Sequence, residues 1–568
     1  MSFQLSPGVN VSEIDLTTVV PSVLTTAGAF AGTFQWGPAN KIVLVDSEIT
    51  LSKTFGTPNN DSAISFFTAA SFLAYGNNLS LVRAVGSTSK NATGNTAIQI
   101  ANADDFQHNY LNTNNSNTYG AFAARYPGAL GNSLTVEVCD NATDFATWTH
   151  KNYFTSAPTK SDFVAKAGGS NDEMHIVVID ENGLFTGTAG QIVETFPFVS
   201  KAIDASINGV TNYYKQVVFN TSKYIYAIDP VSYTSTHATW GQAGNTTFTQ
   251  LSGIQTVNLS GGTDVVPTDG DLEMAYDLFA NKETLDISLV LTGNASTTLQ
   301  NYIISNIAGD DSTVNSTARK DCVAFISPPQ SAVVNKSGSE SDNITTWLEE
   351  LGTTSSYVVA DSGWKYLFDK YNNVYRWIPL NGDVAGLCVN TDTIRDPWYS
   401  PAGFNRGAVK NAIKLAWNPN KTYRDVLYSA GVNPVVSFPG QGIVLFGDKT
   451  LKNKPSAFDR INVRRLFIVL EKSIAKAAQF SLFEFNDEFT RAQFVALVTP
   501  FLRDVQGRRG ITDFKVVCDT TNNTSQVIDS NQFVGDIYIK PARSINFIQL
   551  NFVAVGTGVD FTTVVGAA

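Results

Sequence analysis

Both ends of the chain are apolar and strand-prone, and this feature limits how the chain can fold. Between Ser544 and Ala568 the only charged side chain is Asp560, and residues 2–22 carry only Glu13 and Asp15. Chain ends are usually polar, whereas an apolar edge strand pairs readily with another strand. Each end therefore completes a sheet of its own chain or adds a strand to another molecule. The residues expected in these strands are Val9, Val11, Ile14, Leu16, Leu550, Phe552, Val559, Phe561 and Val564.

The size and composition of the chain indicate what class of protein it is. A chain of 568 residues is too long for one hydrophobic core and predicts roughly three or four domains. Its 43% hydrophobic and 16% charged residues are typical of a globular protein with little surface charge. No signal-peptide pattern and no long apolar run occurs, so we expect neither export nor membrane insertion. The four cysteines have no paired spacing, which predicts reduced, mostly buried thiols.

The net charge of −11 is divided unevenly along the chain. Residues 1–400 contain 19 Lys and Arg against 37 Asp and Glu, whereas residues 401–568 contain 20 against 13. The first part is therefore acidic, with a net charge of −18, and the last third is basic, with +7. A basic segment on an acidic chain predicts an acidic partner, either nucleic acid or an acidic protein surface.

Alternating strands and helices predict an α/β core with a largely parallel sheet, made from two separated stretches of sequence. The expected strands lie at residues 42–45, 79–85, 285–291, 322–326 and 357–360, and the expected helices at 61–75, 297–308 and 344–351. Between the two stretches, residues 90–273 combine an Asn-rich loop region with short strands among Gly, Thr and Ser. This composition predicts a β-rich insertion that faces outward.

The last third of the chain predicts an α+β domain with two long helices, at residues 460–483 and 487–506. Further strands are expected at residues 442–446, 514–518, 536–540 and 545–555. The first helix has an apolar side, and Arg465, Lys472 and Lys476 lie on the opposite side. We expect this basic side to face outward as an ordinary solvated face. The alternative is a contact for an acidic partner, which the clustering of these residues with Arg464, Arg508 and Arg509 favours.

Motifs for catalysis are weak throughout the sequence. Residues 442–450 resemble a phosphate-binding loop, but Asp448 interrupts it and its middle is strand-forming. Asp361 begins a single Asp-Ser-Gly turn, whereas an aspartic protease needs two such carboxylates. The four histidines have no metal-site spacing, and no G-x-S-x-G elbow occurs. We therefore expect no enzyme, no cofactor and no metal, and favour a role in assembly.

Short motifs stand in a specific order along residues 1–90 and 320–560. The motifs include Pro7-Gly8-Val9-Asn10-Val11-Ser12-Glu13, Leu81-Val82-Arg83, Ala124-Arg125-Tyr126-Pro127-Gly128, Val384-Ala385-Gly386, Ser400-Pro401-Ala402-Gly403, Pro439-Gly440-Gln441-Gly442 and Val463-Arg464-Arg465. With these motifs in this order, the chain resembles the tail sheath protein family of contractile-tailed bacteriophages. Residues 90–270 match only around 125–134.

This resemblance implies a structural subunit that stacks as hexameric rings around a tail tube and contracts to inject the phage genome. It implies a subtilisin-like α/β middle domain without proteolysis, and terminal arms that add strands to neighbouring subunits. The implied partners are further copies of the chain, the tail tube protein, and the baseplate and tail terminator proteins. The implied location is the virion tail, after assembly in the host cytoplasm. Arg464, Arg465, Lys472 and Lys476 are then expected to face the tube.

The predicted domain order is an N-terminal arm at 1–21, a core formed by 22–89 and 274–400, an inserted outer region at 90–273, an inner C-terminal domain at 401–546 and a C-terminal arm at 547–568. Three alternatives remain. The first is a hydrolase on the α/β domain, with Asp361 as its best carboxylate. The second is nucleic-acid binding by the basic third, which the acidic chain and sparse aromatic residues disfavour. The third is the sheath of a phage-derived contractile injection system.

Overall fold

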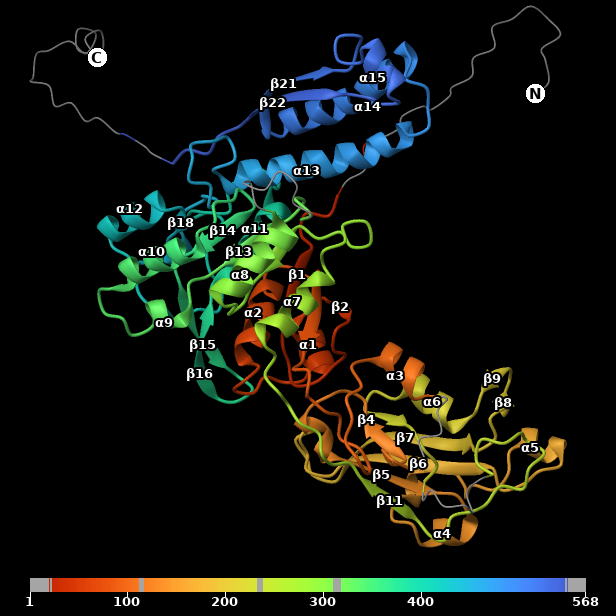
Figure 1. Ribbon diagram of the computed structural model, residues 1–568. Coiled ribbons are helices and arrows are strands. Elements are labelled where there is room, and N and C mark those ends of the chain that lie inside the picture. Colours follow the sequence, from red (N-terminus) through yellow and green to blue (C-terminus); the bar gives the residue numbers. More distant parts are fainter. Residues whose placement is uncertain are drawn as a thin grey trace, which may run out of the picture. The chain divides into compact units, whose positions relative to one another are not determined.

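The computed structural model describes residues Val20, 23–111, 117–231, 239–309, 318–546 and Gln549. These residues divide into two compact units, with the division between Phe480 and Ser481. The nine arm residues named above all lie outside the described residues, as does most of the strand predicted at 545–555. Figure 1 labels the helices and strands of both units.

A seven-stranded sheet forms the centre of the larger unit among the described residues, in the order β18-β14-β13-β12-β1-β3-β2. All neighbouring strands are parallel except β2, which runs antiparallel to β3. Strands buried on both faces favour continuous apolar runs, as in β12 and β13. β3 and β14 are also buried but contain the polar residues Ser80, Arg83 and Asp361. The bounds are β1 Gly28–Thr33, β2 Ile42–Val45, β3 Leu79–Ala84, β12 Leu289–Leu291, β13 Val323–Ile326, β14 Val358–Asp361 and β18 Val432–Asn433.

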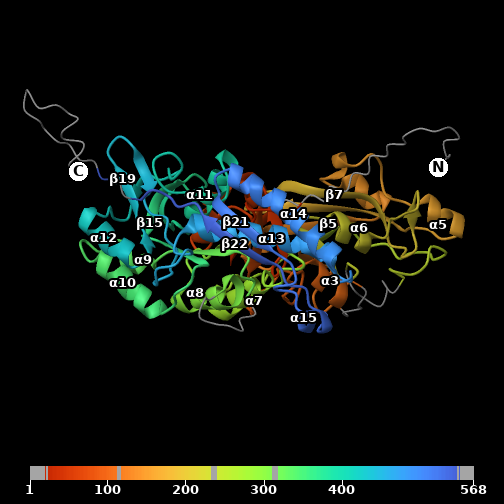
Figure 2. The ribbon, with the colours of Figure 1, turned by 90° about the horizontal axis from the view of Figure 1, so that it is seen from above.

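Helices cover both faces of this sheet. One face carries α7, α8 and α10, and the other carries α2 and α11. Figures 1 and 2 show α7, α8 and α10 side by side. The bounds of the helices around the sheet are α1 Glu48–Phe55, α2 Ala63–Leu73, α7 Asp269–Asp277, α8 Thr297–Ile303, α9 Gln330–Val333, α10 Glu340–Leu351, α11 Asn381–Ile394 and α12 Lys421–Ser429.

Helix α11 is buried on all sides over most of its length because a further sheet covers it. This outer sheet consists of β15 Trp364–Asp369, β16 Val374–Pro379 and β17 Lys414–Leu415, and β16 packs on α2. A hairpin of β19 Val435–Phe438 and β20 Gly442–Leu445 follows β17. The core therefore has four layers: helices, the central sheet, helices, and the outer sheet.

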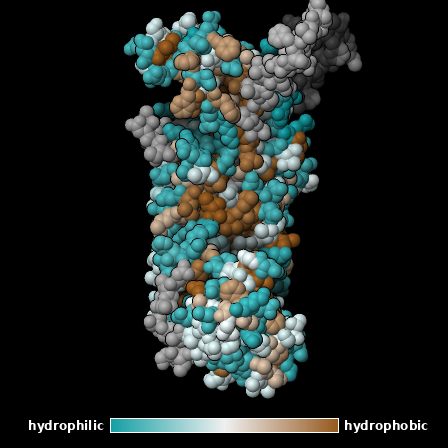
Figure 3. Space-filling model, turned by 90° about the vertical axis from the view of Figure 1, so that its right-hand side faces the viewer, coloured by the Kyte–Doolittle hydropathy of each residue, from teal (hydrophilic) through white to brown (hydrophobic). Residues whose placement is uncertain are grey.

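The edge strand β2 leaves apolar side chains uncovered. Leu44 on β2 and Ile49 at the start of α1 are both exposed. Figure 3 views the molecule from the side on which β2 lies in Figure 1, and hydrophobic residues gather on the core part of that face. This edge is therefore a further surface that favours contact with another protein.

The insertion begins after β3 and returns to the core before α7, and it is rich in strands, as predicted. Its four-stranded antiparallel sheet has the order β11-β5-β6-β7. The bounds are β4 Phe122–Ala124, β5 Leu134–Cys139, β6 Glu173–Asp180, β7 Gln191–Ser200, β8 Ser206–Ile207, β9 Val210–Thr211, β10 Ile225–Ala227 and β11 Gln255–Asn258, with α3 Ala103–Asn109, α4 Ala142–Thr147, α5 Asp162–Ala167 and α6 Tyr214–Thr221.

Buried Arg83 at the end of β3 fixes the insertion to the core. Its guanidinium donates to the backbone oxygens of Phe34 and Gly37 in the core, and at 2.7 Å to that of Pro127 in the insertion. Two motifs that carried the resemblance, around residues 81–83 and 124–128, therefore meet at one point. Burial lowers the pKa of Arg83 to about 10, so the side chain stays charged at neutral pH.

The predicted boundary at residue 400 differs from the division that the structure has. Residues 401–480 belong to the larger unit, because β18 extends the central sheet next to β14. The long helix α13 Ile461–Ala478 also belongs to this unit. The smaller unit contains α14 Glu488–Gly507, β21 Ile511–Val517, α15 Ser525–Asp529 and β22 Asp536–Pro541. The helices predicted at 460–483 and 487–506 and the strands predicted at 442–446, 514–518 and 536–540 are confirmed in type.

Candidate interaction surfaces

Arg465 of α13 is buried in an ion pair of its own chain. Its Nη1 and Nη2 donate to the two carboxylate oxygens of Asp392 on α11, at 2.8 and 2.6 Å. Burial opposes the charge of the guanidinium, but the Asp392 carboxylate outweighs this effect and raises the pKa of Arg465. Arg465 therefore joins α13 to α11 inside the core.

Arg464 is also enclosed by the core. Its guanidinium lies between two rings, 4.4 Å from the centre of Tyr357 and 4.0 Å from that of Phe458. Its Nε and Nη1 have no hydrogen-bond acceptor among the described residues. Cation–π contacts on both sides thus hold this charge inside the core.

The two lysines of α13 bind acidic residues near the start of β12. Lys472 donates to Asp286 at 2.9 Å and to the backbone oxygen of Ile287 at 2.6 Å. Lys476 reaches the second oxygen of Asp286 at 3.2 Å. Both lysines therefore hold α13 against the core.

The prediction that these four basic residues face outward is wrong for three of them. Arg464 and Arg465 are 4% exposed and the Lys472 side chain 9%, whereas the Lys476 side chain is 47% exposed. The first turns of α13, from Ile461 to Leu466, are buried on every side, so the helical period did not separate an inner from an outer face there. No sequence signal identified Asp392 or Asp286 as partners, since both are far from α13 along the chain.

The smaller unit presents a two-stranded sheet with open edges. Strands β21 and β22 pair with each other and with no further strand among the described residues. On one face, Phe514 and Val516 lie opposite Ile539 and Ile537, and α14 packs against β21. Two-stranded sheets are marginal alone, and open edges are ready to accept further strands.

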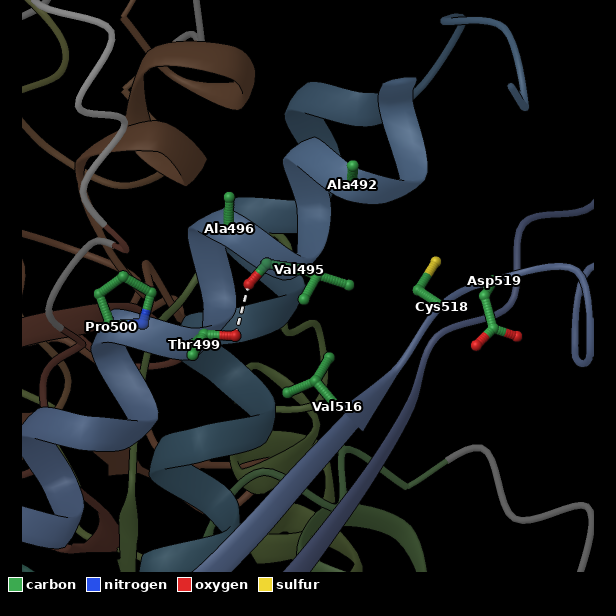
Figure 4. A pocket seen from close by; sticks show the side chains of 8 residues that line it. All are labelled: Ala492, Val495, Ala496, Thr499, Pro500, Val516, Cys518 and Asp519. Atoms are coloured by element: carbon green, nitrogen blue, oxygen red, sulfur yellow. Dashed lines mark hydrogen bonds between the residues drawn. The ribbon is translucent and has the colours of Figure 1, made fainter. Parts of the chain in front are cut away.

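A groove runs between α14 and β21 (Figure 4). It holds about 590 Å³ and is lined by residues of α14, by Val516 of β21 and by the turn after β21, but by none of β22, so it lies beside the end of β21. Small residues on α14 leave this space open. The lining residues are Ala492, Val495, Ala496, Thr499, Pro500, Val516, Cys518 and Asp519.

The segment that leads into α14 exposes several large apolar side chains. Leu482, Phe483, Phe485 and Phe489 all lie in the smaller unit and are largely exposed. Exposed apolar residues at this density indicate a protein contact rather than a solvated surface. Together with the groove, they make the smaller unit the strongest candidate for strand addition.

Asp361, the best candidate for catalysis by sequence, lies inside the core. It is buried at the end of β14, where Ser327 Oγ and the Gly363 amide donate to its two oxygens at 2.6 and 2.9 Å. It lines neither the groove along β21 nor the shallow pocket beside β7. This position fits a structural carboxyl and offers no access to a substrate.

The buried position of Asp361 predicts a pH-dependent stability. Burial raises its pKa to about 8, from an ordinary value of about 4 in the unfolded chain. The folded state therefore binds more protons in this interval, and stability falls as the pH rises from about 4 to about 8. We expect Asp361→Asn to reduce this fall, measured by urea unfolding at several pH values. Equal pH slopes for the two proteins contradict the assignment.

The described residues contain no group of three or more His, Cys, Asp or Glu side chains placed to hold a metal ion. Cys139, Cys322, Cys388 and Cys518 are buried thiols, which confirms the prediction from their spacing. Within the described ranges, no helix combines the length and apolar character that a membrane span requires.

Comparisons with known proteins match three parts of the chain. Residues 25–84 match the tail sheath protein Gp18 domain III N-terminal region, residues 290–451 the phage tail sheath protein central domain, and residues 453–554 the phage tail sheath C-terminal domain. The tail sheath protein of Vibrio phage KVP40 is 33% identical to this chain, and the alignment covers 99% of this chain and 100% of that protein. The tail sheath protein of Enterobacteria phage T4 is also 33% identical, with 99% of both chains covered.

The chain belongs to the tail sheath protein family of contractile-tailed bacteriophages. Solved sheath structures share its mixed α/β multidomain fold. The sheath tail protein of Listeria innocua has a TM-score of 0.53 at 12% identity, covering 91% of this chain and 95% of that one. The contracted helical sheath of the anti-feeding prophage has a TM-score of 0.51 at 12% identity, covering 97% and 99%. The family predicted from the ordered motifs is thus confirmed.

Proposed function

We propose that this chain is the structural subunit of a phage contractile tail sheath. Copies stack as hexameric rings around the tail tube, and contraction drives the tube through the host envelope and ejects the genome. The observation that carries this proposal is the 33% identity to two phage tail sheath proteins over essentially the whole chain. Those phage relatives favour a phage tail over a phage-derived injection system.

Strand exchange between copies is the proposed means of assembly. The smaller unit has open sheet edges and an apolar groove along β21, and the chain carries two apolar, strand-prone ends. A strand added beside β21 pairs the free backbone groups of that edge and covers the small residues of α14. The arms at 1–21 and 547–568 are the proposed donors. Such tethers keep the copies linked while they move during contraction.

The other partners follow from the same function. The insertion faces outward, the smaller unit lies innermost against the tube, and the core is a subtilisin-like domain without proteolysis. The baseplate and tail terminator proteins bind the two ends of the sheath, which is assembled in the host cytoplasm and carried on the virion. The assembly involves no direct contact with nucleic acid and no membrane insertion.

Attachment to the tube is proposed to use exposed charge. Arg464, Arg465 and Lys472 are enclosed by groups of their own chain. Of the four residues predicted to face the tube, only Lys476 keeps a substantially exposed charge. In the smaller unit, Arg503, Arg508 and Arg509 are exposed around the end of α14. Exposed ion pairs are worth roughly 0 to 1 kcal/mol each, which suits an attachment that breaks on contraction.

Electron microscopy of the purified protein, alone and with tail tube protein, tests the proposed function. We expect striated tubes or stacked rings of sixfold symmetry in negative stain. A protein that remains monomeric at high concentration with tube protein present contradicts the proposal.

The groove beside β21 predicts a specific assembly defect. Ala496→Glu places a charge in the groove while its exposed site on α14 tolerates it, so we expect a folded monomer with little polymer. Gln493→Glu adds the same charge to an exposed site of α14 outside the groove and serves as the control. Circular dichroism reports folding, and sedimentation velocity reports assembly. Normal polymers of the Ala496 variant exclude the groove as the strand site.

A further inference from the structure

The four layers of the core leave two outer faces that differ in chemistry. The helical face consists of α7, α8 and α10, and the aromatic face consists of the outer sheet β15–β16–β17 with the hairpin β19–β20. Figure 2 shows α7, α8 and α10 along one side of the core and β19 on the other. The two faces are therefore available for contacts at the same time.

The aromatic face is built on cross-strand pairs. Tyr366 lies opposite Trp377 and Phe368 opposite Tyr375, and all four rings point away from α11, because Lys365 and Leu367 between them point inward. Ring centres of these pairs lie 4.6 and 5.2 Å apart. Phe368 is 44% and Tyr375 54% exposed. Exposed rings of this kind are enriched at the centres of protein interfaces.

Cations lie over this face without carboxylate partners. Lys414 Nζ lies 4.9 Å from the centre of Tyr366 and 5.5 Å from that of Trp377. Arg424 lies 5.7 Å from Phe438 and 5.8 Å from Phe446, at the adjacent hairpin. Among the ion pairs of the described chain, neither cation is bound to an Asp or Glu. The aromatic face is therefore positively charged as well as apolar.

The helical face has the complementary charge. α7 and α10 each contain four acidic residues and no basic one, and α8 contains no charged residue. Asp277, Asp342, Glu349 and Glu350 are exposed. No ion pair within the described residues neutralises any acidic side chain of these helices. The exposed side chains of Met274 and Leu278 on α7 add apolar surface.

We propose that the aromatic face of one copy docks on the helical face of the next copy. This contact rests on the proposed sheath function and adds a direct core-to-core contact to the strand exchange. The two surfaces differ, so a contact between them is head-to-tail. A head-to-tail contact closes into a ring or continues as a helix, depending on the rotation between copies.

Charge complementarity favours a second copy of the chain as the partner that binds the aromatic face. The terminal arms carry only Glu13 and Asp15 at one end and Asp560 at the other, so they bring little charge to meet Lys414 and Arg424. The helical face brings acidic side chains from two helices together with apolar surface. An acidic partner of another kind, including nucleic acid, is an outcome that the experiments below distinguish.

Zero-length crosslinking tests whether the two faces meet. A carbodiimide is applied to an assembled mixture of copies with natural and heavy nitrogen, and the peptides are identified by mass spectrometry. We expect isotopically mixed peptides that join Lys414 to Glu349 or Glu350. If polymers form but none of the isotopically mixed crosslinks contains these residues, the proposed contact is wrong and the sheath function is unaffected. A chain that never assembles overturns both.

A charge swap tests whether the contact contributes to assembly. Lys414→Glu on one face, or Glu349→Lys with Glu350→Lys on the other, is expected to raise the protein concentration needed for polymerisation about tenfold, since each places like charges together. The three substitutions combined are expected to restore assembly to within about threefold of the parent. Lys166→Glu at an exposed site of α5 is the control. The proposal is overturned if both one-sided variants assemble like the parent, or if the triple variant does not recover assembly. If the protein binds DNA and only Lys414→Glu abolishes that binding, the aromatic face is a nucleic-acid site instead.

Discussion

Removal of residues 559–568 is expected to give a folded monomer that no longer polymerises. The deleted segment contains Val559, Phe561 and Val564 and a single charged side chain, Asp560. In the proposed assembly it adds a strand to a neighbouring copy, so its loss leaves an edge of that copy's sheet unpaired. The deletion removes nothing from the four layers of the core, which all lie before residue 481. We therefore expect native circular dichroism and an unchanged unfolding transition.

Sedimentation velocity and negative-stain microscopy measure the effect of this deletion. The control is the full-length chain with Val564→Ile, which keeps an apolar β-branched residue and is expected to assemble normally. Val559→Asp with Val564→Asp keeps the length but introduces charge, and is expected to behave like the deletion. Sheath-like tubes from the deleted chain contradict the role of the C-terminal arm.

The pattern of strands and helices was predictable because each is encoded by neighbouring residues. Apolar runs such as residues 322–326 predict buried parallel strands, and the structure has β13 there. Asp487 before the second long helix predicts its start, and its side chain caps α14 by accepting from the Thr490 amide. The β-rich character of the insertion followed from its composition. These features need no knowledge of distant contacts.

The surroundings of each element were not predictable in the same way. The period of α13 identified Val463, Leu466 and Leu470 as an apolar side, and all three are buried. It did not reveal that the core encloses the first turns on their other side too, because that depends on α11 and on the segment before β1. For the same reason the boundary at residue 400 was misplaced. Val432 and Asn433 alone do not predict a strand, and only their pairing with β14 assigns them to the central sheet.

The charge split between the two parts of the chain also acquires a structural meaning. Part of the positive charge after residue 400 is neutralised internally by carboxylates of the acidic part, as Arg465 is by Asp392 and Lys472 by Asp286. A net charge along the sequence therefore overstated the basic surface. Accessible positive charge remains on the aromatic face around Lys414 and at the end of α14 around Arg503 and Arg509, among other places. These two are sites where an acidic protein partner is to be sought.

Loss of the Arg465 charge is expected to be the most damaging single substitution described for this fold. Arg465→Gln leaves the Asp392 carboxylate buried without its cation, and breaking a buried ion pair in this way costs about 3–5 kcal/mol. Urea unfolding measures this cost, in the background of the 559–568 deletion so that the protein stays monomeric. Lys476→Gln, at the half-exposed end of the same helix, is expected to cost less than about 1 kcal/mol.

A double variant separates the cost of an unpaired charge from the worth of the pair itself. Arg465→Met with Asp392→Leu removes both charges and is expected to lose less stability than Arg465→Gln alone, because no buried charge is left without a partner. If Arg465 faced the tube instead, Arg465→Gln in the full-length chain would leave the unfolding transition unchanged and weaken assembly on tube protein. That result would return Arg465 to the tube interface, whereas a loss of stability with the double variant partly restored identifies it as the residue that fixes α13 to α11.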